Sequence, residues 1–216
     1  VQTLAVQASI ALNAAGQYQI ERERSEAIQH RADTMSSLTD ISRAINFDQP
    51  LEQQLRFIGN AIQGSTPFQA VLFSVYEPDT GLLRRITGVG FSQEVLGELL
   101  SRKQPLESVQ QLFKPEFLIS RSYFIPADKT PIVPADVHMV TLDVEQVDQD
   151  ENAWNPDDFL IVPLNDAQGN SLGLISLDAP NDGLRPDKTT IDTIEIFAAQ
   201  AGLVIDNTSR FSELRN

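Results

Sequence analysis

Apolar side chains recur along this chain with two different periods, which predict a long helix followed by a compact mixed domain. Residues 4–46 carry apolar side chains at helical spacing, and from Tyr18 to Ile45 there is neither proline nor glycine. This pattern predicts one nearly continuous helix. Its apolar seam is thin and partly polar, so the helix cannot bury it alone. We expect the seam to pair with the same helix of a second chain as a parallel coiled coil, or else to pack on its own domain.

The compact part opens with a helix and a strand pair. Asp48 followed by Pro50 predicts a helix start, and the segment from Gly64 to Pro67 predicts its end. Residues 70–76 are apolar on both alternating faces, which is typical of a central strand that is covered on both sides. The Pro-Asp-Thr-Gly turn that follows predicts an antiparallel return strand.

The rest of the chain continues to alternate helices and strands. Residues 126–158 contain four prolines and no periodicity, so we expect a long loop there. Short turns inside both strand pairs indicate antiparallel hairpins, and therefore the α+β class. The expected strands are 70–76, 82–89, 117–125, 158–164 and 171–178, and the expected later helices are 92–100, 107–113 and 187–212.

The two ends of the chain resemble each other. The segment from Leu4 to Tyr18 reads like the segment from Phe197 to Phe211, which begins 193 positions later (residue 4 against residue 197). Alanine-rich helices can look alike through shared composition, but the order of small, apolar, amide and aromatic positions favours a true repeat. The identical pairs are Ala5 with Ala198, Gln7 with Gln200, and Ala8 with Ala201.

The repeat predicts the domain organisation. We expect residues 1–18 to be the terminal helix of a preceding domain and residues 19–46 to be a connecting, coiled-coil-like helix. Residues 47–212 then form one complete domain with its own closing helix, and residues 213–216 begin the next linker.

Charge and composition exclude several classes of partner and chemistry. With 30 acidic and 16 basic residues, the net charge of −14 argues against nucleic acid and against anionic membrane surfaces, which attract clustered Lys and Arg. No apolar run approaches the roughly 20 residues of a membrane span, and the N-terminus lacks the basic lead of a signal peptide. We therefore expect a cytoplasmic protein without direct membrane contact. There is no cysteine, which excludes disulfides, thiolate zinc sites and cysteine nucleophiles.

A set of short motifs in the last part of the chain resembles the C-terminal half of a GAF domain. In that family a strand ends in Pro-Leu, a glycine turn leads to a strand with Gly-Leu, and a helix of the Ala-Gln-Ala type closes the fold. The resemblance extends over residues 38–212 and is strongest in the last 55 residues of that range. The matching positions are Val162-Pro163-Leu164, Gly169, Gly173-Leu174, Ala199-Gln200-Ala201 and Asp206-Asn207.

This resemblance implies a fold and a kind of function. It implies a six-stranded or similar antiparallel sheet with the terminal helices on one face and a ligand cavity on the other. It also implies a sensory or regulatory domain in a tandem-GAF signalling protein, such as a sensor histidine kinase of a two-component system or a cyclase. Any kinase or cyclase domain of the parent protein would lie outside this chain.

The sequence departs from the better-defined members of that family. Covalent bilin carriers and the methionine sulfoxide reductases of this fold use cysteine, so both are excluded, and the cyclic-nucleotide pattern is missing. Haem needs an axial histidine, and within the domain only His138 is available, on a proline-flanked loop, so we do not expect haem as a cofactor. With His30 as the second histidine of the chain, no nucleophile–base–orienter set can be assembled, so we expect no catalytic residues and no enzyme activity.

Arg121 is the residue whose placement most needs an explanation. On a regular strand it shares a face with the apolar Ile119 and with Tyr123. One interpretation is an anchor for an anionic small molecule in a cavity also lined by Phe73, Tyr123 and Trp154. The alternative is an ion pair with the acidic loop, or an exposed edge strand. Trp154 itself either plugs the loop onto the domain or caps the mouth of a cavity.

The acidic loop is rich in the oxygen ligands that metal ions use. Residues 143–158 contain seven acidic side chains and no basic one, and calcium takes oxygen ligands of this kind. Their spacing lacks the order of a calcium-binding loop, so a solvated loop is favoured and no metal site is predicted.

Two hypotheses about function remain from the sequence. In the first, a small molecule binds the cavity and changes the packing of the N- and C-terminal helices in a homodimer. In the second, the domain binds no ligand and acts as a dimerising relay between its neighbours.

Overall fold

The computed structural model describes residues 49–137 and 152–213, together with residues 16–22, 24–25, 28–29, 32, 35–36 and 39. The chain divides into two compact units, Val1–Asp40 and Ile41–Asn216. The described residues of the first unit are helical. Most of the helix predicted over residues 4–46 lies outside the described residues. His138 and the acidic residues between 143 and 151 lie wholly outside them.

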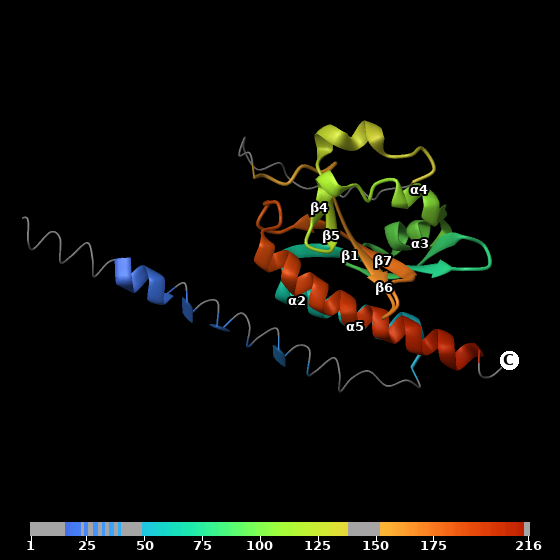
Figure 1. The fold of residues 1–216 in the computed structure, drawn as a ribbon, viewed down its shortest axis with the longest axis horizontal. Helices are drawn as coiled ribbons and strands as arrows, with labels where there is room; N and C mark the ends of the chain where they lie inside the picture. Colours follow the sequence, from blue (N-terminus) through green and yellow to red (C-terminus); the bar gives the residue numbers. More distant parts are fainter. Residues whose placement is uncertain are drawn as a thin grey trace, which may run out of the picture. The chain divides into compact units, whose positions relative to one another are not determined.

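Among the described residues, an antiparallel sheet of seven strands forms the centre of the second unit, in the order β3-β2-β1-β7-β6-β5-β4 (Figure 1). The central position of β1, between β2 and β7, agrees with its two apolar faces. The predicted α+β class and antiparallel sheet are thereby confirmed. The strands are β1 (Phe68–Glu77), β2 (Leu82–Val89), β3 (Lys103–Pro105), β4 (Leu118–Ile119), β5 (Ser122–Ile125), β6 (Phe159–Asn165) and β7 (Ser171–Pro180).

Two long helices cover one face of the sheet. The helices α2 (Leu51–Ser65) and α5 (Lys188–Glu213) pack against each other and against the sheet, as Figure 1 shows. Helix α5 begins after Asp187, whose Oδ1 accepts a hydrogen bond from Thr190 N at 2.7 Å. This is the side-chain cap that stabilises the first turn of a helix.

The opposite face of the sheet is covered by shorter elements. Helix α3 (Gln93–Ser101) is capped by Ser92, whose Oγ accepts a hydrogen bond from Val95 N at 3.3 Å, and α4 (Leu106–Gln110) follows it. We call the buried apolar residues on this side of the sheet the far-face cluster. Its members are Leu83, Val109, Leu112, Phe117, Ile125, Val137, Phe159, Ile161 and Leu174.

The predicted third strand, 117–125, is wrong as a single strand. The structure has a 3₁₀ turn at Pro115–Phe117 and then a tight hairpin made of β4 and β5. The chain reverses at Ser120, which adopts a left-handed conformation with φ of 60°. Such a conformation costs a non-glycine residue about 1–2 kcal/mol, so tertiary contacts have to maintain it. Arg121 therefore lies at the tip of a hairpin and shares no strand face with Ile119 and Tyr123.

Candidate functional site

A small cavity lies between the sheet and the elements on its far face. Its walls are mostly apolar and include Leu72, Val109, Ile161 and Leu174. The cavity measures about 30 Å³, which holds water but no metabolite, because ligand pockets span roughly 300–1,000 Å³. A ligand larger than water could enter only if the walls moved apart.

A buried cation faces this cavity. Arg85 of β2 lines it and is only 4% exposed, and its Nη1 donates a hydrogen bond to the Leu99 carbonyl oxygen at 3.4 Å. Burial lowers the pKa of Arg85, and the charge of Arg102 lowers it further. A guanidinium at an apolar wall suits a carboxylate or phosphate, to which it can donate two parallel hydrogen bonds.

Further polar groups surround Arg85 on the same side of the sheet. Gln104 and Asp178 are also buried and line the cavity. Ser74 is paired across the sheet with both Arg85 and Leu174. The Ser74 hydroxyl is buried and has no hydrogen-bond partner among the described residues. An unsatisfied buried hydroxyl costs roughly 1–3 kcal/mol, and a polar ligand atom or a water molecule would relieve that cost.

At one side of the cavity, Asp158 joins three separate segments. Its Oδ2 pairs with Arg185 Nε at 3.0 Å and accepts from Asn155 N at 3.0 Å, while Oδ1 accepts from Ala127 N at 2.7 Å. The side chain of Asp158 is fully buried. The expectation of a solvated acidic loop is therefore wrong at Asp158, because its carboxylate is satisfied by partners within the protein.

The four residues expected to line a ligand site lie in different places, and none of them lines this cavity. Arg121 lines a separate open hollow of about 280 Å³ together with Glu195. Phe73 faces α2, since its ring lies 3.1 Å from where a Cβ on Gly59 would be. Tyr123 stacks on Phe113 with ring centroids 4.5 Å apart. Trp154 is buried against Phe68 and Phe124, an arrangement that matches the plug interpretation.

Arg121, the fourth of these residues, is 73% exposed and forms an ion pair with Glu195 of α5, with Nε to Oε2 at 3.0 Å. Its partner is thus a helix residue and not the acidic loop, while its exposure at the β4–β5 end of the sheet agrees with the expected edge position.

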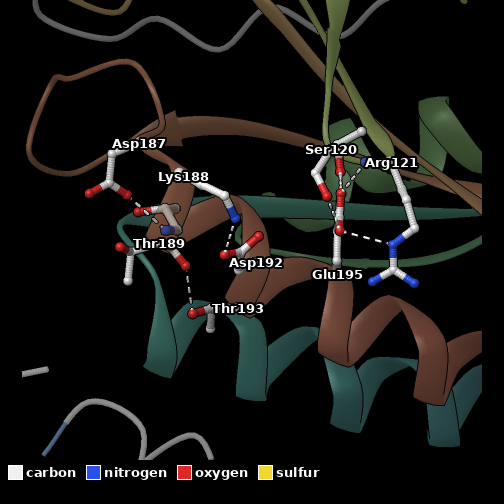
Figure 2. Close-up of polar contacts among 10 residues, drawn as sticks. Ser120, Arg121, Asp187, Lys188, Thr189, Asp192, Thr193 and Glu195 are labelled. Carbon is white, nitrogen blue, oxygen red and sulfur yellow. Dashed lines mark hydrogen bonds and ion pairs between the residues drawn. The ribbon is translucent and has the colours of Figure 1, made fainter. Parts of the chain in front are cut away.

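Glu195 is a buried carboxylate that binds the tip of the β4–β5 hairpin (Figure 2). Its Oε1 accepts from Arg121 N at 2.7 Å and from Ser122 Oγ at 2.8 Å. Its Oε2 accepts from Ser120 Oγ at 2.9 Å and from Arg121 Nε at 3.0 Å. Burial raises the pKa of Glu195, but these hydrogen bonds, led by that of the Arg121 amide, together hold it below the ordinary value of 4.5.

We expect Glu195 to make stability depend on pH in the acid range. A carboxyl whose pKa is lower in the folded state contributes stability above its unfolded pKa, about 4.5, and loses that contribution as pH falls through the folded value. The difference in unfolding free energy between the wild type and Glu195→Gln should therefore shrink in acid, as measured by urea denaturation on either side of that value. A difference that grew in acid would contradict this. Glu98→Gln, a change at an exposed ion pair with Arg102, should keep the acid dependence of the wild type.

Sequence reasoning missed both Arg85 and Glu195, although each left a signal. Arg84 and Arg85 are consecutive in a strand, so they point to opposite faces, and one of them has to be buried if both faces are covered. Glu195 follows Ile191 by four residues and precedes Ala198 by three, which places it on the apolar face of the closing helix.

The described residues contain no group of three or more His, Cys, Asp or Glu side chains placed to hold a metal ion. Among the same residues, no helix has the length and apolar character needed to cross a membrane.

Solved structures of GAF domains share the fold of this chain. The GAF domain of an Acinetobacter phosphoenolpyruvate-protein phosphotransferase matches with a TM-score of 0.58 at 12% identity, over 82% of this chain and 94% of that chain. The GAF domain of a putative sensor histidine kinase from Pseudomonas syringae pv. tomato matches with a TM-score of 0.52 at 14% identity, over 88% and 97%. Free methionine-R-sulfoxide reductase from Neisseria meningitidis, in complex with its substrate, matches with a TM-score of 0.55 at 13% identity, over 86% of this chain and 93% of that chain.

The chain therefore has the α+β fold of GAF domains, and identities this low establish the fold alone. No protein family model and no curated protein sequence matches it.

Proposed function

We propose that this chain is a regulatory domain of a signalling protein that binds a small organic anion in the far-face cavity. The observation that carries the proposal is the buried Arg85 guanidinium beside the unsatisfied Ser74 hydroxyl. The two groups are cross-strand neighbours, and together they offer donors to one carboxylate or phosphate. The resemblance to the GAF domain of a putative sensor histidine kinase supports a parent protein of the sensor kinase type.

The proposal assigns no catalytic role to the domain. The reductase from Neisseria meningitidis shares the fold, but this chain has no cysteine to supply a thiolate nucleophile. Binding, followed by a change in the flanking helices, is the activity that the proposal assigns to it.

Transmission through a homodimer is the second part of the proposal. Helix α5 exposes Ile196 and Leu203, seven residues apart and therefore on one face of the helix. Together with the predicted coiled coil of residues 19–46, this face supports pairing with the same helices of a second copy.

Binding is tested with the whole chain and a panel of carboxylates and nucleoside monophosphates, by thermal shift and then calorimetry. A ligand at a hundred times its Kd should stabilise the protein by about 2.7 kcal/mol, and Arg85→Met should weaken binding by about tenfold or more. Arg84→Met is the matched control, because Arg84 is the neighbouring arginine but is exposed and paired with Glu77 at 2.6 Å. Sedimentation velocity of the same samples should show a dimer. Equal binding by Arg85→Met, or a monomer, would contradict the corresponding part of the proposal.

The alternative function is a ligand-free relay between neighbouring domains. The cavity volume of about 30 Å³ favours it, because a domain that needs no ligand can fill its cavity with its own side chains. The absence of any thermal shift across the panel, in a protein that is a dimer, would select this alternative.

A further inference from the structure

The β4–β5 hairpin packs on residues that wall the cavity, although it does not line the cavity itself. Phe117, just before β4, and Ile125, the last residue of β5, are members of the far-face cluster together with Val109 of α4. Tyr123 stacks almost parallel on Phe113, with an interplanar angle of 14°. Because α4 and the hairpin pack in the same cluster and only residues 111–117 separate them along the chain, a displacement of α4 away from the sheet would also displace the hairpin.

At its other end the hairpin is held by α5. Glu195 accepts four hydrogen bonds from residues 120–122, two on each carboxylate oxygen, and Figure 2 shows it pointing from α5 towards Ser120 and Arg121. Helix α5 packs chiefly on α2, β6 and β7. The Glu195 carboxylate is therefore the principal link between α5 and this hairpin.

The sheet itself holds the hairpin weakly. Strand β4 has two residues and is the edge strand, and β5 has four residues, of which three pair with β6. Short edge strands have few ladder hydrogen bonds, so they move at lower free energy than central strands. Packing on the cavity side and Glu195 on the helix side thus determine where the hairpin lies.

We propose that Glu195 couples the far-face cavity to α5 through the β4–β5 hairpin. When the cavity walls separate, the hairpin moves with them, Glu195 loses part of its hydrogen bonding, and α5 loosens. When the cavity is closed, the four hydrogen bonds hold α5 in place. A ligand that binds the widened cavity more tightly than the closed one then shifts the equilibrium towards the loosened helix. The size of this shift is the difference between its two binding free energies. This inference rests on the proposed function, since it describes how that same cavity would signal.

The coupling is tested by a double-mutant cycle in the whole chain, read out by amide hydrogen exchange of α5. Val109→Ala removes a side chain that is 1% exposed in the cavity wall and so loosens the wall. In the Glu195 protein this change should speed exchange at residues 196–205 about threefold or more, whereas in the Glu195→Gln protein it should add little. An equal effect of Val109→Ala in both backgrounds, or no effect in the Glu195 protein, would overturn the proposal.

Two further variants make the result specific. Asp206→Asn removes a negative charge from α5, where Asp206 pairs with Arg210, and leaves the hairpin untouched, so Val109→Ala should still speed exchange in this background. Ser122→Ala removes one of the four hydrogen bonds and keeps the carboxylate, so in this background Val109→Ala should speed the exchange of α5 less than in the wild type. This variant supplies the test if Glu195→Gln fails to fold. Loss of transmission with Asp206→Asn, or full transmission with Ser122→Ala, would count against Glu195 as the link.

The cycle uses no ligand, and this separates it from the test of the proposed function. If the cycle fails while a ligand binds, the coupling is wrong and the binding stands. If no ligand binds while the cycle succeeds, the coupling stands and the domain is a ligand-free relay.

Discussion

Replacing Gly173 by alanine is expected to destabilise the domain by about 3–5 kcal/mol, a large part of the total stability of a typical protein. Gly173 lies in β7 opposite Val75 of β1 and has φ of 152°. A Cβ atom there would lie 2.1 Å from the Ser74 carbonyl oxygen. Both obstacles belong to the backbone of two central strands, so neither a rotamer change nor a small shift relieves them. Urea denaturation followed by circular dichroism measures the loss.

Gly169→Ala is the matched control for this prediction. Gly169 also has a positive φ, 88°, but a Cβ added there would meet no atom within 4 Å. It lies in the turn between β6 and β7, so only the conformational cost of about 1–2 kcal/mol remains. If the two substitutions cost the same, the close approach of β1 to β7 at Gly173 would be refuted.

Replacing Asp158 by alanine should destabilise the domain by about 3 kcal/mol and expose Trp154. The change leaves Arg185 without its carboxylate partner and removes the acceptor of two backbone amides, from Asn155 and Ala127. Breaking a buried ion pair typically costs 3–5 kcal/mol, and the partial exposure of Arg185 (34%) places this case at the lower end. The measurements are urea denaturation and the emission wavelength of Trp154, the single tryptophan.

The fluorescence change follows from where Trp154 lies. Its backbone amide donates to the Gly183 carbonyl oxygen at 2.8 Å, and its side chain is 4% exposed. Asp158 holds the same segment in place, so its loss should shift the emission towards that of a solvated indole. Asp157→Ala is the control, because Asp157 is the neighbouring acidic residue but is exposed, and surface changes usually stay within about 0.5 kcal/mol. An unchanged emission in Asp158→Ala would show that Asp158 does not hold this segment.

Most secondary structure elements could be predicted because their signals are local. The apolar side chains on both faces of residues 70–76 identified the central strand, observed as Phe68–Glu77. Asp187 identified the start of the closing helix, observed as Lys188–Glu213. The hairpin at 118–125 could not be predicted, because its reversal at Ser120 is held by a carboxylate 75 positions away, and the local pattern resembles one continuous strand.

The candidate site was harder to predict than the fold. Arg121 was predicted to lie beside a cavity because alternate residues of a regular strand share a face. The chain reverses at Ser120, so residues 117–125 do not form one regular strand. Arg85 could not be distinguished from Arg84, because the register between β1 and β2 shifts at Phe73 and Ser74. A register shift changes which of two consecutive side chains is buried, and the sequence does not reveal where the shift occurs.

By itself the sequence determined the α+β class, the antiparallel hairpins, the closing helix, and the exclusion of cysteine chemistry. These follow from periodicity, turn residues and composition, all of which act over a few neighbouring positions. Only the tertiary structure decided that Arg85 faces the cavity, that Asp158 is buried, and that Glu195 binds the β4–β5 hairpin. Each of these depends on which distant backbone groups and side chains contact a given charge. A buried charge needs such partners, but the sequence does not identify them.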